Sequence, residues 1–463
     1  MGALSAMGGL SSLTGLLPLS APPMQINNTI TIDWTSTVLS VNRKAYSVNL
    51  YQALNPAIAN AQAYKDAIDY LNPEMVRIHS LEMMKDSTTR PLGWVINPTL
   101  PSYAWDVAKI TNALGNLAPG RTKMLSICRF PAAIADAQGK LLDGKTAEFA
   151  AFCVQLLQIC NQANAGITHI QLLNELDTAY TGATAMATLG AIWNTVRDAI
   201  KSAFPTMVVG GHSFANIYNS VNVDAYLNVC KSKMDFFAYN AYTTSNPTGT
   251  TQQQIWNSAA YSMRDSAKNM KNKLTAQGVG PMPVYATEMG MLILGAYNAL
   301  NVGAKRLVWE GLRLIHTANS DAKFCGAWNE ADDWHGLHSS PSSGYVRRPS
   351  AHLYHLFNQH MLGLLFPIAI TGDTVPVVNS TPVPCVSAMA CQSNGKKAIA
   401  IVNRSELPRV VRFQHNGWMP NESSVLDVNL ITSQGLQTTP IHYEDFAPGY
   451  AMPADSVALI SVR

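Results

Sequence analysis

The strongest restriction on the fold of this chain is an alternation of short apolar runs with longer amphipathic stretches between residues 45 and 365. Helical segments at 146–164, 185–204, 252–274 and 296–318 separate runs that have the length of a buried parallel strand. Eight strands alternating with helices predict a (β/α)8 barrel. The eight runs are 45–51, 74–79, 123–128, 167–173, 207–211, 235–240, 283–288 and 323–328.

Two other α/β architectures agree less well with the same alternation. An open doubly wound sheet would carry a Gly-rich phosphate loop after its first strand, and no such loop follows residue 51. A barrel lyase or aldolase would place a Lys or a metal cluster at its strand ends, but none of the eight runs ends in Lys. We therefore expect a barrel with other chemistry at its C-terminal strand ends.

The pattern changes after about residue 366, where short β-rich segments replace the helical periodicity. They lie at 385–391, 397–402, 408–415, 425–431 and 456–462, and turn pairs such as Asn394-Gly395 separate them. This predicts an accessory antiparallel β-sandwich at 366–463. The segment from Ile30 to Trp34 alternates like a strand, so we expect residues 25–44 to join the sandwich and residues 45–365 to form the barrel.

Residues 1–24 are rich in Gly, Ala, Ser and Leu and are expected to form a flexible or leader-like arm. No Lys or Arg precedes Arg43, so the basic region of a secretory signal is missing, and Gly, Ser and Pro interrupt any membrane span. Secretion or export is still the favoured localisation, without a clear signal peptide.

Composition excludes some classes of partner. Hydrophobic residues make up 47% of the chain and charged residues 13%, and the net charge of +3 is spread without a basic run. Nucleic acid and anionic membranes are therefore not expected partners. An uncharged polar surface with nine Trp and 17 Tyr suits a carbohydrate ligand. The composition does not indicate the oligomeric state.

We expect no cofactor and no metal. The seven cysteines form no CxxC pair and no Cys/His cluster, so buried free thiols are expected, although Cys385 and Cys391 could close a small loop. A metal site built from Glu330, Asp332, Asp333 and His335 is the alternative to an acidic loop without an ion.

Two glutamates end predicted strands in the same way. Glu175 follows the run 167–173, and Glu288 ends the run 283–288, which is 288 − 175 = 113 positions later. One such acid alone is more often a helix cap or a surface charge. Two of them at the loop-bearing end of a barrel are what an enzyme needs to place carboxyl groups on both sides of a glycosidic bond. The other side chains expected at this end are Arg77, His79, Arg129, Asn174, Asn240, Tyr242 and Trp328.

Four motifs at four strand ends carry a family resemblance. They are Val76-Arg77-Ile78-His79, Asn174-Glu175, Thr287-Glu288 and Gly326-Ala327-Trp328. In this order, residues 45–365 resemble the retaining glycoside hydrolases of clan A, and most of all family 39, which contains β-xylosidases and α-L-iduronidases. A C-terminal β-sandwich that takes a strand from before the barrel is also usual in that family.

The resemblance implies that Glu175 is the general acid/base and Glu288 the nucleophile. Arg77 could keep Glu288 ionised and orient it through a bidentate bond. Asn174 could bind the 2-hydroxyl of the sugar, and Trp328 could stack on the sugar ring. Purely structural roles remain open for Arg77, Trp328 and His79.

The chain departs from family 39 at one strand end. Asn240-Ala241-Tyr242 stands where the family usually has His-x-Tyr, so Tyr242 can still bind the nucleophile but Asn240 cannot carry a charge. The segment after the acid/base also lacks the usual proline. A distant branch of family 39, or a separate family of the clan, fits these differences.

The sequence thus predicts a retaining glycoside hydrolase that acts by double displacement, with its two carboxyl groups about 5 to 5.5 Å apart. The alternative is a carbohydrate-binding protein on a barrel without activity. Arg129 could meet a substrate carboxylate or form an ion pair. The loops 81–102 and 243–251 are expected to shape outer subsites, where Trp94, Tyr103 and Trp105 either stack on sugars or pack the loop.

Overall fold

The computed structural model describes residues 25–98, 103–244, 251–292, 299–320, 322–377 and 380–462. The expected arm 1–24 lies outside the described residues, as do residues 99–102 of the loop 81–102 and residues 245–250 of the loop 243–251. None of the described helices is long and apolar enough to cross a membrane.

The predicted (β/α)8 barrel is confirmed. Eight parallel strands close on themselves, and each strand follows its neighbour in chain order around the barrel. Strand β4 is buried along its whole length, as expected where a barrel interior covers one face and helices cover the other. The strands are β3 (Ser47–Leu50), β4 (Met75–His79), β7 (Thr122–Ile127), β8 (Ile167–Leu172), β9 (Val208–Phe214), β10 (Phe236–Thr244), β11 (Val284–Leu292) and β12 (Phe324–Ala327).

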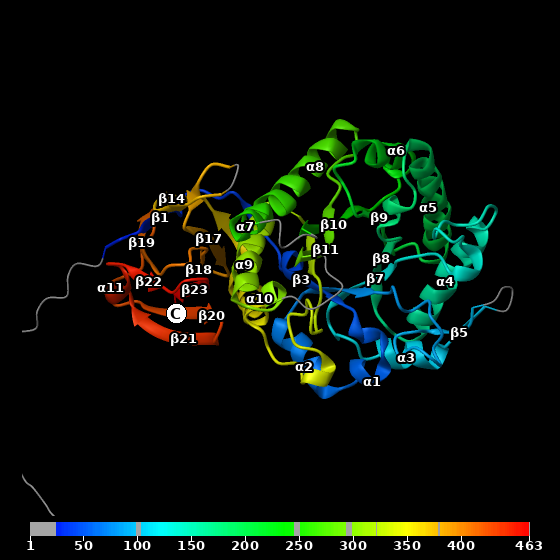
Figure 1. The fold of residues 1–463 in the computed structure, drawn as a ribbon, viewed down its shortest axis with the longest axis horizontal. Helices are drawn as coiled ribbons and strands as arrows, with labels where there is room; N and C mark the ends of the chain where they lie inside the picture. The colour runs from blue at the N-terminus through cyan, green and yellow to red at the C-terminus, as the bar shows by residue number, and fades with distance from the viewer. Residues whose placement is uncertain are drawn as a thin grey trace, which may run out of the picture.

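Helices surround the barrel (Figure 1). One predicted helix, 252–274, is divided by a π-helical turn at Ala260–Asp265, and the helix predicted from residue 296 begins at Ala304. The helices are α1 (Pro56–Ala59), α2 (Gln62–Leu71), α3 (Val107–Leu114), α4 (Thr146–Gln162), α5 (Ala183–Ala203), α6 (Ser220–Cys230), α7 (Gln252–Ala259), α8 (Ser266–Ala276), α9 (Ala304–Ala318) and α10 (Pro349–His360). A small hairpin of β5 (Val95–Asn97) and β6 (Ala104–Trp105) lies between β4 and α3.

A second body of two sheets lies beside the barrel (Figure 1). One sheet has the order β14 (Ile368–Gly372), β1 (Asn28–Asp33), β19 (Arg409–Asn416) and β22 (Tyr450–Met452). The other has the order β2 (Leu39–Val41), β13 (Gly363–Phe366), β17 (Val386–Ser393), β18 (Lys396–Asn403), β23 (Ser456–Val462), β20 (Val425–Thr432) and β21 (Gly435–His442). Apolar side chains from both sheets, such as Ile30 and Ile401, form one core between them.

The strand before the barrel lies inside this sandwich. β1 pairs with β14 in antiparallel register and with β19 in parallel register, so one pair departs from the antiparallel pattern that was predicted for the sandwich. The second sheet also begins before residue 366, because β13 already pairs with β17. The chain therefore starts a β-sheet, builds the barrel and then returns to complete the sheet.

Helix α9 joins the two bodies by packing against β18 and β23. The contact is close at Gly311, where an added Cβ would lie 2.7 Å from Val402 Cγ2 and 3.1 Å from Val457 Cγ2. Arg404 and Gln253 exchange hydrogen bonds of 3.1 and 3.0 Å across the same junction. The sandwich is thus fixed to the helical side of the barrel.

Candidate active site

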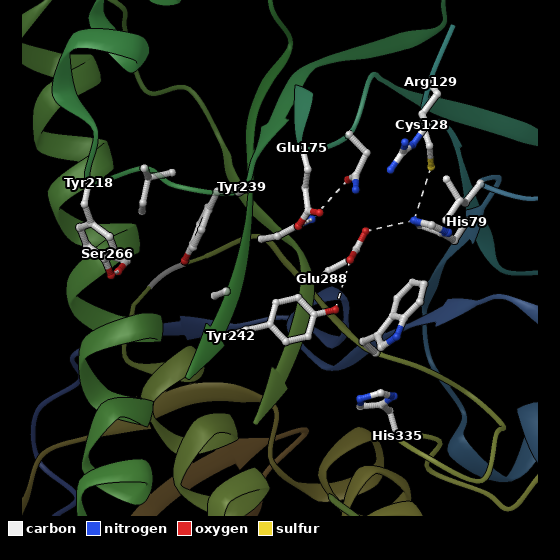
Figure 2. Close-up of a pocket in the computed structure, with 17 residues that line it drawn as sticks. His79, Cys128, Arg129, Glu175, Tyr218, Tyr239, Tyr242, Ser266, Glu288 and His335 are labelled. Carbon is white, nitrogen blue, oxygen red and sulfur yellow. Dashed lines mark hydrogen bonds and ion pairs between the residues drawn. The ribbon is translucent and has the colours of Figure 1, made fainter. Parts of the chain in front are cut away.

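A cavity of about 480 Å³ lies at the C-terminal ends of the barrel strands. Its lining comes from the end of β4 and from the ends of β7 to β12, and it includes both predicted glutamates. Figure 2 shows the carboxyl groups of Glu175 and Glu288 near the middle of this cavity.

Three side chains hold the carboxyl group of Glu288. Arg77 Nη1 donates to Oε1 at 3.0 Å, and His79 Nε2 lies 3.2 Å from the same oxygen. The Tyr242 hydroxyl donates to Oε2 at 3.2 Å. Because both oxygens have partners, from β4 across the barrel and from the neighbouring β10, the carboxyl group is fixed in position and orientation.

The surroundings of Glu288 favour its ionised form. Burial alone would raise the pKa of this carboxyl group, but the charges and hydrogen bonds of His79 and Arg77 outweigh burial and bring the pKa to about 2. Glu288 is therefore a carboxylate throughout the neutral range.

Arg77 is fully buried, and it binds several side chains besides Glu288. Its Nη2 donates to Gln171 Oε1 at 2.6 Å and to Asn174 Oδ1 at 2.9 Å, while Nη1 also donates to Asn49 Oδ1 at 2.7 Å. The expected bidentate bond to Glu288 is wrong, because only Nη1 reaches that carboxylate. The other edge of the guanidinium binds Gln171 on β8 and Asn174, two residues past the end of that strand.

The backbone turns sharply at Glu175. Leu173 and Glu175 both have left-handed conformations, with φ of 67° and 56°, which non-glycine residues rarely adopt. The Glu175 N–H donates to the carbonyl of Ser213 at 2.8 Å, so the turn is tied to the next strand. Strain held in this way is common where a side chain must leave a strand at a defined angle.

The surroundings of Glu175 act in the opposite direction to those of Glu288. Burial raises the pKa of Glu175, the nearby charge of Glu288 raises it further, and the hydrogen bond from Asn240 lowers it. The Asn240 bond, from Nδ2 to Glu175 Oε1, measures 2.8 Å. One cavity thus contains one carboxyl group whose pKa is lowered and one whose pKa is raised.

Two donors determine the orientation of the Asn174 amide. Its Oδ1 accepts from Arg77 Nη2 at 2.9 Å and from Asn240 Nδ2 at 3.3 Å. With the oxygen occupied, the Asn174 Nδ2 group is the one that can donate to a ligand. The expected bond from Asn174 to a sugar hydroxyl stays a prediction.

Asn240 is oriented in a similar way from the other side. Its Oδ1 lies 2.8 Å from the hydroxyl groups of both Ser213 and Thr287, so its Nδ2 faces Glu175. The register of β10 and β11 also places Asn240 beside Glu288. Asn240 therefore supplies a neutral donor at the position where the resembling family has a histidine.

Tyr242 reaches Glu288 because Gly290 leaves room for its ring. A Cβ at Gly290 would lie 2.6 Å from Tyr242 Cε1 and 2.9 Å from Cδ1. The two residues face each other in the β10–β11 register. The glycine was not anticipated, since its importance depends on a partner on another strand.

Trp328 forms a wall of the cavity together with two other rings. Its centroid lies 4.6 Å from that of His79 and 5.7 Å from that of Tyr51, both nearly perpendicular. The Trp328 ring is half-buried, so part of it remains open to a ligand.

Cys128 is a polar cavity residue to which the sequence pattern assigned no function. It follows β7, and its Sγ lies 3.4 Å from His79 Nε2 and 3.3 Å from the Ser126 hydroxyl. The available signal was its position at the end of a predicted strand, the same signal that identified the glutamates.

Two of the outer aromatic residues, Trp94 and Trp105, are buried. Trp94 is fully buried and donates to the Leu54 carbonyl at 2.8 Å, and Trp105 is packed against Phe152. Their possible role in sugar stacking is therefore wrong, and they pack the loop. Arg129 is exposed at the cavity, and no ion pair joins it to another described residue.

The acidic loop after β12 binds backbone groups. Asp332 Oδ1 accepts the N–H of Trp334 at 2.7 Å, and Glu330 Oε1 accepts the N–H groups of Tyr51 and Gln52 at 2.9 and 2.7 Å. In the part of the chain that the structure describes, no three His, Cys, Asp or Glu side chains are arranged to hold a metal ion.

Solved structures share this fold over nearly the whole chain. A family 51 α-L-arabinofuranosidase from Bifidobacterium longum has a TM-score of 0.68 at 13% identity, covering 95% of this chain and 100% of its own. A family 39 β-xylosidase from Caulobacter crescentus has a TM-score of 0.65 at 14% identity, with coverages of 94% and 99%. An α-L-arabinofuranosidase from Thermotoga maritima has a TM-score of 0.65 at 13% identity, with the same coverages.

At these identities the likeness shows the fold, which is the barrel with a β-sandwich found in clan A glycoside hydrolases of families 39 and 51. No protein-family model matches the sequence, and no curated protein matches it.

Proposed function

From the fold shared with clan A glycoside hydrolases, we propose that this protein is a retaining glycoside hydrolase with Glu288 as nucleophile and Glu175 as acid/base. The observation that carries the proposal is the pair of carboxyl groups in one cavity whose pKa values are shifted in opposite directions. A nucleophile must be ionised, whereas the residue that protonates the leaving group must hold a proton.

The first step forms a glycosyl-enzyme. A carboxylate oxygen of Glu288 attacks the anomeric carbon while Glu175 donates its proton to the glycosidic oxygen, so the carbon–oxygen bond to the leaving group breaks. Tyr242 and Arg77 hold the two oxygens of Glu288 in position. Asn174 Nδ2 donates to the sugar 2-hydroxyl, a contact that strengthens as positive charge develops on the ring.

The second step releases the sugar. Glu175, now ionised, removes a proton from water, the water oxygen bonds to the anomeric carbon, and Glu288 leaves as a carboxylate. Once the first step has removed the proton of Glu175, Asn240 donates to a carboxylate, which stabilises the base form. Because Asn240 is uncharged, it stabilises the ionised form of Glu175 without preventing the protonated form.

The solved structures with this fold suggest the first substrates to test. Their names include α-L-arabinofuranosidase and β-xylosidase, so we propose aryl α-L-arabinofuranosides and aryl β-D-xylosides as the opening panel. Nuclear magnetic resonance of the first-formed sugar should show the configuration of the substrate. Inversion would exclude the double displacement.

The two carboxyl groups should have different roles in mutants. Glu288→Gln should abolish turnover on every substrate. Glu175→Gln should slow substrates with poor leaving groups far more than 2,4-dinitrophenyl glycosides, and azide should restore turnover. Glu148→Gln, on the surface of α4, is the matched control and should behave as wild type.

A crystal structure of the protein with a bound sugar should place the carboxyl groups about 5 to 5.5 Å apart. Sugar binding without turnover on the whole panel would instead support a carbohydrate-binding protein. Equal losses in both variants on all substrates, with no effect of azide, would show that the roles are misassigned.

A further inference from the structure

A line of polar contacts joins Cys128 to the candidate nucleophile. Cys128 Sγ lies 3.4 Å from His79 Nε2, and the same nitrogen lies 3.2 Å from Glu288 Oε1. Figure 2 shows the contacts running from Cys128 through His79 to Glu288. Both Cys128 and His79 line the catalytic cavity, so this thiol faces the space in which a sugar would bind.

The charges around His79 favour a second anion at Cys128. Glu288 already has the guanidinium of Arg77 as a counter-charge at 3.0 Å. A protonated His79 adds a second positive charge to the same buried region. The rings of Tyr51 and Trp328 pack against His79, tilted and nearly perpendicular to it, and they supply no negative charge to balance it. The Cys128 sulfur is the remaining group within reach of Nε2.

The electrostatic balance supports the same pairing. Burial alone would raise the pKa of the Cys128 thiol, but His79 lowers it, with help from Arg77 and Ser126, to about 7. Burial alone would lower the pKa of His79, but Cys128 and then Glu288 raise it to about 9. A thiolate beside an imidazolium is the arrangement that activates a cysteine.

We propose that Cys128 is a modification site, at which a nucleophilic thiol paired with His79 reacts with compact sulfur electrophiles such as small disulfides and thereby stops hydrolysis. The effect on hydrolysis rests on the proposed function, whereas the reactivity of the thiol does not. The adduct would lie one residue away from Glu288 along the line of contacts, inside the cavity.

The chemistry can be written for methyl methanethiosulfonate, the probe used below. The Cys128 thiolate attacks the sulfenyl sulfur, a Cys128–S–S–CH3 bond forms, and the S–SO2 bond breaks with its electron pair leaving as methanesulfinate. No proton is consumed, and His79 keeps its own. Dithiothreitol reverses the adduct by thiol–disulfide exchange.

The other cysteines provide an internal comparison. All seven cysteines are buried, but burial leaves the pKa of the other six thiols raised, and none of those six lines the cavity. One equivalent of reagent at pH 7 should therefore label Cys128 at least about tenfold faster than any other cysteine, because the thiolate is the reacting form.

Peptide mass spectrometry of the labelled full chain tests the site directly. The labelling rate should rise with pH around a midpoint near 7. His79→Gln should slow labelling at pH 7 by at least about fivefold, because a smaller fraction of Cys128 is then thiolate. The higher nucleophilicity of that thiolate offsets part of the loss. Cys385→Ser, in the sandwich, is the control and should label like wild type.

Activity tests the consequence. Labelled wild type should lose more than nine-tenths of its aryl glycosidase activity and regain it with dithiothreitol, whereas Cys128→Ser should be insensitive to the reagent. If that variant does not fold, the labelling of the wild-type protein still decides the site.

Preferential labelling of another cysteine, or a midpoint near 9 that His79→Gln does not change, would overturn the proposal. So would a fully labelled Cys128 with undiminished activity. Absence of any glycosidase activity in the unlabelled protein would overturn the proposed function and the claim about hydrolysis, while the labelling experiment would still decide whether Cys128 is the reactive thiol.

Discussion

At the scale of single residues, two glutamates of the same chemical type differ because of their neighbours. Glu288 meets a guanidinium, an imidazole and a phenol, whereas Glu175 meets one amide and the negative charge of Glu288. Burial raises the pKa in both cases, so the difference comes from the partners. Replacing one of these partners should therefore shift the pH dependence of activity even where the structure stays the same.

His79 is the partner whose removal should be easiest to detect. His79→Gln removes a positive charge and a hydrogen bond from Glu288, so the pKa of Glu288 should rise from about 2. The acidic limb of kcat/KM on a 2,4-dinitrophenyl glycoside should move to higher pH by at least about one unit. His169→Gln, at the opposite end of the barrel strands, is the matched control and should leave that limb in place.

The same shift affects stability with a defined sign. The pKa of Glu288 is lower in the folded protein than its ordinary value of 4.5, so its ionisation stabilises the fold above that pH and the contribution is lost as the pH falls toward 2. His79→Gln brings the folded pKa closer to 4.5, so this acid-induced loss of stability should be smaller and should be complete at a higher pH. Unfolding by urea, measured from pH 6 to pH 3, compares the two proteins.

Gly290 controls Tyr242 through space. Gly290→Ala should displace the phenol ring, because the new Cβ would lie 2.6 Å from Cε1. We expect kcat to fall about as much as in Tyr242→Phe, on the order of tenfold, since both changes remove one hydrogen bond to Glu288, the proposed nucleophile. Gly280→Ala, where no atom lies within 4 Å of the added Cβ, should have no effect. Normal activity in Gly290→Ala would show that the Tyr242 ring can move without any loss of activity.

At the scale of strands and helices, burial decided what the sequence could reveal. The barrel strands are covered on both faces and appear as apolar runs, so all eight were predicted. β21 was missed because it is an edge strand with mostly exposed side chains and a proline, Pro440. The interruption of the helix between α7 and α8 was missed because a π-helical turn keeps the apolar spacing nearly unchanged.

The site was predictable to the extent that strand ends were predictable. Glu175, Glu288 and Arg77 were found because parallel barrel strands bring their C-terminal ends together. The contacts of Cys128 with His79 and of Asn240 with Glu175 were not, because each depends on which way a side chain points across a strand pair. A single sequence contains no record of those directions.

The loop after β12 contains a carboxyl group that should affect stability. Glu330 is buried, and burial raises its pKa to about 7 even though the N–H groups of Tyr51 and Gln52 oppose the rise. A pKa above the ordinary 4.5 means that the folded state prefers the protonated form. The stability that protonated Glu330 contributes is present below pH 4.5 and is lost as the pH rises toward 7.

Glu330→Gln should therefore flatten the fall in stability between pH 5 and pH 7, because an amide does not titrate. Above pH 7 the variant should be at least as stable as wild type. Thermal unfolding at each pH measures the difference, with Glu148→Gln as the exposed control. If the stability of the variant falls with pH as steeply as that of wild type, groups other than Glu330 cause the fall.

At the scale of the whole molecule, helix α9 couples the barrel to the sandwich. Gly311→Val should lower the free energy of unfolding by about 2 to 3 kcal/mol, because the added side chain meets the stiff side chains of Val402 and Val457. Urea unfolding measures the loss, and Gly280→Ala is again the neutral comparison. An unchanged free energy of unfolding would mean that the barrel and the sandwich can separate slightly without destabilising the protein.

The place of β1 in the sandwich has a consequence for synthesis. Its antiparallel partner β14 begins at Ile368, so 368 − 33 = 335 residues separate them along the chain. At the usual rate of translation, β1 waits roughly 17 to 67 s for that strand, and longer for β19. During this interval Ile30 and Ile32 have no sheet to cover them, and the whole barrel can fold first. Among the described strands, β1 is thus the first to leave the ribosome and one of the last to find its place, and it is where we expect a chaperone to bind the nascent chain.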